Sequence, residues 1–358
     1  MNIKEKVKDL PLTPGVYLMK DSQGHIIYVG KAKNLKRRVQ SYFQNIKAHP
    51  QKIKKLMANL NDFDYILTDT EFEAFMLECK LIKEMKPIFN RKMKSPKSYP
   101  YIVIKMDNGH QILEVTDKII DNDKNLYFGP FINKYTTERA IQGLKEAFKI
   151  SCSKPFMKNG PCLNYSLGLC IGMCLGGHAL DHYDNIINKI IDLLSGTDFS
   201  ILEELNQSMI TASEQFDFET AAKYRNMLDA INPIIYKEQV IEFTEENKTI
   251  VVRESLNDST FKLFFIKGNK VLFSEKYHLG CTNGLEHLQS IKEKILTNFN
   301  PSTSPTKVSK NDLDEAQIIY SYLMSENCSY KIIPEIWLES EKRTLIDEAL
   351  NELIIHYV

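Results

Sequence analysis

The first hundred residues carry tyrosines, cations and carboxylates in an order that suits work on a phosphorylated ligand. Two short runs each join a tyrosine to a glycine, Gly15-Val16-Tyr17 and Tyr28-Val29-Gly30. Basic residues follow the second run at once: Lys31, Lys33, Lys36, Arg37 and Arg38. Glu78 and Asn90 come later. A guanidinium makes forked contacts to phosphate, and a single carboxylate can hold a hard divalent cation that keeps several of its waters.

Charge is distributed unevenly along the chain, although the formal net charge is zero. Residues 1–100 contain 20 Lys and Arg against 10 Asp and Glu, so the remainder is acidic to the same extent. This asymmetry indicates a polyanion bound at one end of the chain, and a merely solvated basic surface is the alternative.

The 358 residues have an ordinary globular composition, with 43% hydrophobic and 26% charged residues. No apolar run approaches the eighteen or so residues that span a bilayer. The first ten residues are charged and do not resemble a signal peptide. We therefore expect a cytoplasmic protein with no membrane partner.

Four of the seven cysteines lie in one stretch that is also rich in glycine. They are Cys152, Cys162, Cys170 and Cys174. Such a group indicates a metal centre. Structural zinc sites usually have two close pairs of ligands, whereas only the last two cysteines are close here, and iron–sulfur clusters tolerate uneven spacing. The spacing alone leaves both centres open.

The elements that must position these residues alternate between strands and helices. We expect a hairpin over 14–30, a helix capped by Asn34, a helix near 52–60, a strand near 63–69 and a helix over 71–86. Further on, 198–232 is predicted to form a helical hairpin closed by Pro233. Strands are predicted at 249–253, 261–267 and 270–273. The expected domains are 1–98, 99–192, 193–236 and 237–358.

The N-terminal motifs together resemble the GIY-YIG nuclease domain in the form found at the N-terminus of UvrC, a subunit of the bacterial excinuclease. The similarity runs through Pro14–Tyr17, Ile27–Leu35, Arg38, Ser41–Phe43, Glu73–Glu78 and Pro87–Asn90. It implies an α+β multidomain protein that begins with a three-stranded antiparallel sheet and helices. It also implies a cysteine region, a helical hairpin and a C-terminal α/β segment after that domain.

The resemblance also implies a role for each site residue. Glu78 would bind Mg²⁺ or Mn²⁺, and Arg38 would contact the scissile phosphate. Tyr28 would be the general base, with its pKa lowered by neighbouring cations such as Lys31. The remaining catalytic positions would be Tyr17, Gly30, Tyr42 and Asn90. The DNA-binding cations would be Lys33, Lys36 and Arg37.

Two further motifs resemble UvrC. Its cysteines hold a [4Fe–4S] cluster, which the four cysteines here would hold as well, with Zn²⁺ as the alternative. The run Glu214–Arg225 is similar to the UVR motif through which UvrB and UvrC bind each other. The partner-binding residues would be Phe216, Phe218, Glu219, Ala221, Ala222 and Arg225. The alternative is a helical hairpin that packs only on its own protein.

The resemblance predicts a metal-dependent DNA endonuclease of nucleotide excision repair. It would cut damaged double-stranded DNA on the 3′ side of a lesion after recruitment by a UvrB-like helicase. One alternative is a catalytically silent competitor of the full-length excinuclease, and another is a free-standing nuclease of mobile elements. The chain stops before the RNase-H-like nuclease and helix–hairpin–helix repeats of UvrC, so we expect a short paralogue similar to Cho or a fragment.

Overall fold

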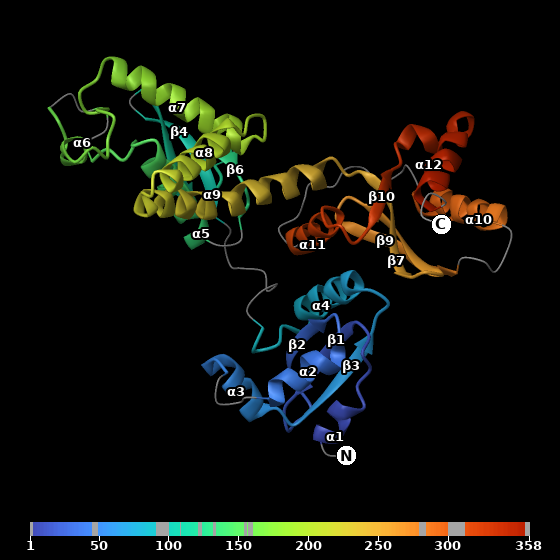
Figure 1. The fold of residues 1–358 in the computed structure, drawn as a ribbon. Helices are drawn as coiled ribbons and strands as arrows, with labels where there is room; N and C mark the ends of the chain where they lie inside the picture. The colour runs from blue at the N-terminus through green and yellow to red at the C-terminus, as the bar shows by residue number, and fades with distance from the viewer. Residues whose placement is uncertain are drawn as a thin grey trace. The chain divides into compact units, whose positions relative to one another are not determined.

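The structure is a computed structural model. It describes residues 3–44, 49–90, 100–107, 109–120, 124–131, 134–153, 156, 160–278, 284–299 and 312–354. The chain divides into two compact units. One combines residues 1–95 with 243–358, and the other is 96–242. Figure 1 shows their helices and strands, and the two units are described separately.

The N-terminal part of the first unit is built on a three-stranded antiparallel sheet of order β2-β1-β3. Its strands are β1 (Gly15–Lys20), β2 (Ile26–Ala32) and β3 (Asp62–Leu67). Its helices are α1 (Ile3–Lys8), α2 (Leu35–Phe43), α3 (Gln51–Asn59) and α4 (Glu71–Met85). The predicted sheet is confirmed, and each predicted helix and strand lies within a few residues of its expected place.

Alternating side chains of β1 separate two small cores in this domain. Val16 and Leu18 pack with apolar residues of α4. Tyr17 and Met19 face the opposite way, into the core that contains α2. Because successive strand residues point to opposite faces, one short strand carries both the packing for α4 and the first motif tyrosine.

Side-chain caps fix where the two motif-bearing helices begin. Asn34 caps α2, as predicted, and its side-chain oxygen accepts a hydrogen bond from the Arg37 backbone N–H at 2.9 Å. Thr70 caps α4 in the same way through the Glu73 N–H. The helix α4 ends at Met85, and its C-cap Lys86 has a left-handed conformation and directly precedes Pro87.

The C-terminal part of the first unit contains a four-stranded sheet of order β10-β7-β8-β9. Its strands are β7 (Thr249–Asn257), β8 (Thr260–Lys267), β9 (Lys270–His278) and β10 (Ser329–Ile332). Its helices are α10 (Gly284–Asn298), α11 (Leu313–Leu323) and α12 (Thr344–Ile354). Every residue of β8 is buried, because Phe265 belongs to one hydrophobic core and Phe264 to another on the opposite face.

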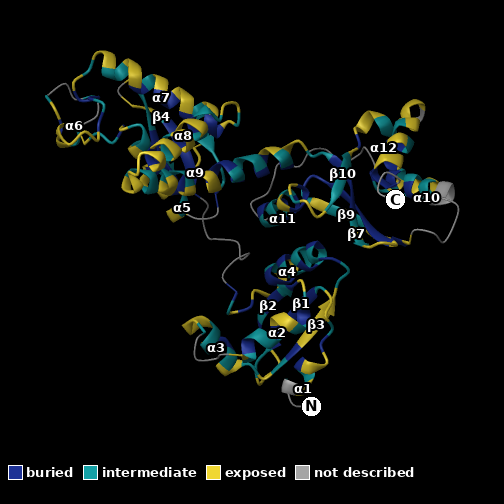
Figure 2. Ribbon diagram, in the orientation of Figure 1, coloured by how far each residue is buried: buried dark blue, intermediate teal, exposed yellow. Residues whose placement is uncertain are grey.

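The second unit joins a three-stranded sheet, order β5-β4-β6, to a set of helices. The strands are β4 (Tyr101–Asp107), β5 (His110–Thr116) and β6 (Leu126–Phe128). The helices are α5 (Lys134–Ala147), α6 (Leu163–Ser166), α7 (His178–Leu194), α8 (Ser200–Glu214) and α9 (Phe218–Glu245), of which α9 continues three residues past the end of this unit at Glu242. The inner faces of α7, α8 and α9 share one core with the sheet, and their outer faces are exposed (Figure 2).

The helix α9 does not stop at Pro233, which corrects the sequence prediction. It continues to Glu245 with the proline inside it. A proline costs a helix one backbone hydrogen bond, but Ile231, Ile234 and Ile235 are buried around this position and stabilise the continuous helix. The expected domain limits at 192/193 and 236/237 fall inside α7 and α9, and the limit at 98/99 lies outside the described residues.

Among the described helices, none combines the length and apolar character needed to cross a membrane.

Candidate active site and thiol cluster

Three tyrosines and an arginine form a connected group beside the sheet. The hydroxyls of Tyr17 and Tyr42 lie 2.8 Å apart, and Arg38 donates a hydrogen bond to the Tyr42 hydroxyl at 3.3 Å. The Arg38 guanidinium also lies over the Tyr42 ring. The rings of Tyr17 and Tyr28 are 6.1 Å apart. The structure therefore brings together the tyrosines of both strand motifs and the cation and tyrosine of α2.

Two glycines of the motifs are needed for close approach. A Cβ on Gly30 would lie 2.3 Å from the Tyr17 hydroxyl oxygen, which crosses this position from the neighbouring strand. A Cβ on Gly15 would lie 2.4 Å from the Ile66 carbonyl oxygen. A side chain at either position would displace its neighbours, so glycine is required on steric grounds.

Glu78 reaches the same pocket from α4. The pocket is lined by Tyr17, Tyr28, Arg38, Glu78 and Asn90, among others. One Glu78 oxygen accepts a hydrogen bond from the Lys31 backbone N–H at 3.0 Å. Burial raises the pKa of the Glu78 carboxyl, and the N–H and positive charge of Lys31 and the charge of Arg38 offset only part of that rise. Glu78 is half-buried and none of its side-chain oxygens has an ion pair among the described residues, so the carboxylate is available to a divalent cation.

The side chain of Lys31 is not the cation beside Tyr28, contrary to the sequence prediction. Its ammonium lies 2.7 Å from a Glu71 oxygen and over the Phe75 ring. Burial, Tyr42 and Glu78 raise the pKa of Tyr28, and Arg38 is the cation that lowers it. The expected lowering of the Tyr28 pKa by Lys31 is therefore absent from this arrangement. Lys31 serves the pocket through its backbone N–H instead.

Asn90 is a positioning residue for strand β2. Its side-chain oxygen accepts from the Val29 N–H at 2.9 Å, and its side-chain NH₂ donates to the Val29 carbonyl at 2.8 Å. Asn90 is buried, and the pair of bonds ties the end of the domain to the residue between Tyr28 and Gly30. Asn90 also lines the pocket, so its amide connects strand β2 directly to the site.

The basic residues differ in where they lie. Lys33 and Arg37 line the pocket, whereas Lys36 is not among its lining residues. Lys52, on α3, lines it as well and was not expected. Its contribution depends on how α3 folds back on the domain, and no local motif in the sequence marks that packing.

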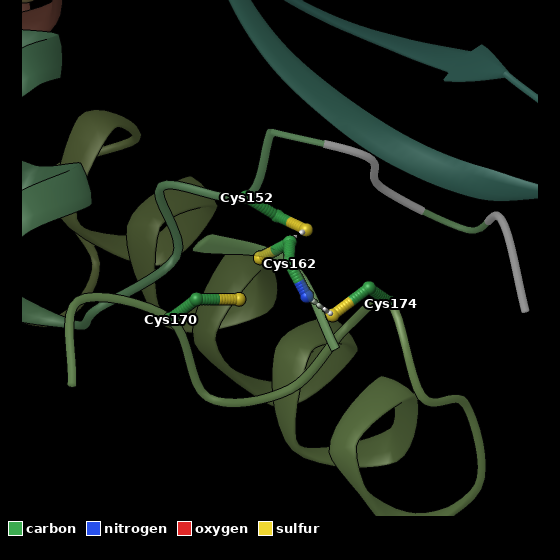
Figure 3. Close-up of side chains that lie close together, drawn as sticks. All are labelled: Cys152, Cys162, Cys170 and Cys174. Atoms are coloured by element: carbon green, nitrogen blue, oxygen red, sulfur yellow. Dashed lines mark hydrogen bonds between the residues drawn. The ribbon is translucent and has the colours of Figure 1, made fainter. Parts of the chain in front are cut away.

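The four cysteines converge although they are spread over more than twenty residues. Their Sγ atoms all lie within 4.8 Å of one another, and all but Cys152 are buried (Figure 3). The sulfurs of Cys152 and Cys162 are 3.7 Å apart. The predicted convergence is confirmed, and four thiols at this separation provide the ligand set of a metal centre.

Backbone N–H groups point at the sulfurs of this cluster. Tyr165 N–H donates to Cys162 Sγ at 3.3 Å, and Gly172 N–H donates to Cys170 Sγ at 3.4 Å. Loss of hydration alone would raise the pKa of Cys162, but the N–H groups of Tyr165 and Ser153 and the neighbouring thiols lower it to about 6. These contacts favour the thiolate of Cys162, which is the form of cysteine that binds metal.

The turn between α8 and α9 exposes two aromatic rings. Phe216 is 80% exposed and Phe218 is 65% exposed, with their ring centroids 6.2 Å apart. Beyond them, Ala221 and Ala222 are half-buried, and Glu219 and Arg225 are exposed. Glu219 pairs with Lys223 on the same helix. The other ends of both helices are buried in the unit's own core. The hairpin thus combines internal packing at one end with an unpartnered apolar surface at the other.

The three-stranded sheet, the tyrosine pair across it and the glutamate of α4 define a domain of the GIY-YIG class. Comparison with known families places three successive matches on the chain: a UvrC-like GIY-YIG domain at 13–91, a UvrC/Cho excinuclease middle domain at 99–193 and a UvrB/UvrC motif at 200–232. Over these residues the chain belongs to the UvrC family.

Relatives match nearly the whole chain. The UvrABC system protein C of Caldanaerobacter subterraneus is 35% identical over 99% of this chain and 58% of its own length. That of Clostridium kluyveri is 37% identical over 83% of this chain and 48% of its own. The chain thus spans about half the length of the curated relatives it matches.

Solved structures resemble the first quarter of the chain. The GIY-YIG N-terminal endonuclease domain of UvrC from Thermotoga maritima, bound to magnesium as its catalytic divalent cation, is 36% identical. The match covers 25% of this chain and 96% of that one, with a TM-score of 0.23.

Proposed function

We propose that the chain is a metal-dependent DNA endonuclease of nucleotide excision repair. It hydrolyses a phosphodiester on the 3′ side of a lesion after recruitment by a UvrB-like helicase. The observation that carries this proposal is the convergence of Tyr28, Arg38 and Glu78 on one pocket, in a domain of the UvrC family.

Each of these side chains has a distinct task in hydrolysis. Arg38 is held by Tyr42, so its guanidinium is oriented for a forked contact to the scissile phosphate. Tyr28 is the proposed general base for the attacking water; its pKa is raised in this arrangement, and a divalent cation held at Glu78 would lower it toward the phenolate that this role needs. Tyr17 holds Tyr42 in place through their shared hydrogen bond, and the absence of a side chain at Gly30 lets Tyr17 lie there.

Glu78 is the residue that would hold Mg²⁺ or Mn²⁺. Such a cation, when bound, lowers the pKa of nearby hydroxyl groups and neutralises charge on the phosphate. The Lys31 N–H fixes one oxygen of Glu78 and orients the carboxylate toward the pocket. Lys33, Arg37 and Lys52 line the pocket and would attract the DNA backbone, so binding should weaken as the salt concentration rises.

The cut position and its dependence on the partner test this function. A duplex with one bulky lesion is labelled at one end and incubated with Mn²⁺ and a UvrB-like protein preloaded at the lesion. A single nick on the 3′ side, seen only with the partner present, is the expected result. Stable binding to the loaded partner without any nick would instead support the competing-binder hypothesis, which the exposed Phe216 and Phe218 favour.

The thiol cluster is proposed to hold a [4Fe–4S] cluster, on the resemblance to UvrC. A specific observation favours the alternative of a single Zn²⁺. With metal–sulfur bonds of about 2.3 Å, a tetrahedral ion would need sulfurs about 3.8 Å apart; Cys152 and Cys162 are 3.7 Å apart, and all four sulfurs lie within 4.8 Å of one another. Broad visible absorbance with iron and sulfide in the purified protein supports the cluster, and a colourless protein with one zinc per chain overturns it.

The exposed end of the α8–α9 hairpin is proposed to bind the UvrB-like partner. Phe218 and Phe216 supply an apolar anchor, and Glu219 and Arg225 flank it with opposite charges. Burying two exposed aromatic rings against a similar hairpin gives a large apolar contact from few residues.

A further inference from the structure

The helix that carries Glu78 is buried on two sides. One face of α4 places Ala74, Leu81 and Ile82 against strands β1 and β2. The opposite face places Phe72 and Cys79 in a second core, together with residues of β7, β8 and α11 from the C-terminal part of the same unit. Glu78 lies on the first of these faces, four residues from both Ala74 and Ile82, so the second face acts on its position through the helix itself.

An aromatic contact holds the first turn of α4 on this second face. The Phe72 ring stacks on the Tyr322 ring with centroids 3.9 Å apart and an angle of 7° between the planes. Phe264 meets the same Phe72 ring edge-on at 5.2 Å. The Tyr322 hydroxyl donates to Glu254 at 2.7 Å, and Glu254 also accepts a hydrogen bond from Thr70, the residue that caps α4.

Ion pairs secure both ends of the helix. Lys262 on β8 is only 7% exposed, and its ammonium lies 2.7 Å from Asp69 and 2.6 Å from Glu73. At the other end, Lys83 of α4 pairs with Glu315 of α11. Breaking a buried pair leaves an unpaired charge, so the helix start is strongly tied to β8.

We propose that residues 243–358 act as a positioning domain for the nuclease, in which Lys262, Phe72 and Tyr322 set α4 so that Glu78 meets Tyr28 and Arg38. This inference rests on the proposed function. Glu78 is less than two turns from Glu73, and a rigid helix transmits a shift of its first turn to that carboxylate. A small misplacement of a catalytic group is enough to reduce the rate by tenfold or more, on the order of what substrate-positioning changes cause.

The test compares Lys262→Met with Lys267→Met in the full chain. Lys267 is a matched control, because it lies on the same strand, is 8% exposed and pairs at 3.2 Å with Glu335, away from α4. Two quantities are measured below the melting temperature of every variant: Mn²⁺ binding without DNA, and the rate of nicking at saturating Mn²⁺. Lys262→Met is expected to weaken Mn²⁺ binding and slow nicking by about tenfold each, with Lys262→Arg largely restoring both.

Lys267→Met is expected to lower thermal stability and leave both quantities unchanged. The inference is overturned if Lys262→Met binds Mn²⁺ and nicks DNA as well as the wild-type protein does. It is also overturned if Lys267→Met loses as much Mn²⁺ affinity and nicking rate as Lys262→Met. If Lys262→Met does not fold, Glu73→Gln, which removes one of its two partners, takes its place under the same criteria. A wild-type protein that binds Mn²⁺ yet never nicks DNA would contradict the proposed function. In that case the comparison of Mn²⁺ binding between the two lysine variants would still decide whether residues 243–358 position α4.

Discussion

At the scale of single residues, the site depends on contacts between hydroxyl groups that the sequence places far apart. Tyr17 and Tyr42 are separated by 25 positions, yet their hydroxyls share a 2.8 Å hydrogen bond and together orient Arg38. The sequence identified all three residues through their motifs. It misassigned the charge beside Tyr28, because the direction of the long Lys31 side chain is decided by Glu71 and Phe75 rather than by its neighbours in the chain.

The close approach at Gly30 yields a prediction. Gly30→Ala places a methyl group 2.3 Å from the Tyr17 hydroxyl oxygen and so displaces Tyr17 from Tyr42. We expect a destabilisation of about 1–3 kcal/mol from overpacking, with nicking reduced by about tenfold or more. Urea unfolding and nicking assays measure the two effects.

Gly143→Ala is the matched control for this change. Its Cβ would meet no atom closer than 3.7 Å, and Gly143 lies inside helix α5. Alanine favours a helix by up to about 1 kcal/mol over glycine, so this variant should be at least as stable as the wild-type protein and fully active. Wild-type nicking by Gly30→Ala would show that Tyr17 is not needed where the structure puts it.

At the scale of elements, the predictions succeeded where one local pattern decided the outcome. The helix cap at Asn34, the β1–β2 hairpin and the three-stranded sheet follow from short stretches with clear periodicity or cap chemistry. The continuation of α9 through Pro233 could not be predicted in this way, because the packing of the isoleucines around Pro233 outweighs a local helix-breaking signal. The second buried face of α4 was also missed, since its partners lie some 170 to 250 positions away in the chain.

The α8–α9 turn yields a prediction about docking. Phe218→Ala removes a largely exposed ring that contacts the Phe216 ring at the turn, so the free energy of unfolding should change by no more than about 0.5 kcal/mol. Affinity for the UvrB-like partner should fall by tenfold or more, about 1.4 kcal/mol or more, as for an interface anchor. Calorimetric titration measures the affinity, and chemical denaturation measures the stability.

Tyr135→Ala is the control for nonspecific surface hydrophobicity. Tyr135 is 67% exposed and lies on α5, outside the UVR motif. Its substitution should leave partner affinity unchanged. Equal affinity for the partner before and after Phe218→Ala would support a hairpin that serves only its own unit.

At the scale of the whole molecule, the first unit joins the two ends of the chain through the contacts of α4. The charges at this contact make its contribution to stability depend on pH. Burial alone would raise the pKa of Asp69, but hydrogen bonds and charge from Lys262 and Lys276 outweigh it and hold the pKa below the usual value. A carboxylate with a lowered folded pKa stabilises the protein above its unfolded pKa, and this contribution is lost as the pH falls through the folded pKa.

Asp69→Asn therefore gives a prediction with a definite sign. The variant should be less stable than the wild-type protein at pH 6–7, and the difference should shrink as the pH drops below about 4, the usual pKa of an aspartate. Urea unfolding at a series of pH values measures the difference. Asp258→Asn, in an exposed turn, is the control. A stability difference that stays constant down to pH 3 would contradict the assigned ion pair.

The most direct measurement of the central claim is single-turnover nicking of lesion-containing DNA by Glu78→Gln and Glu84→Gln, each with the loaded partner and Mn²⁺. Both glutamates lie on α4, but Glu78 opens on the pocket and Glu84 is exposed outside it. The account predicts that Glu78→Gln loses nicking by a factor of about a hundred or more while remaining folded and bound to the partner, and that Glu84→Gln cuts normally. Undiminished nicking by Glu78→Gln would contradict the account, because the DNA would then be cut somewhere other than this pocket.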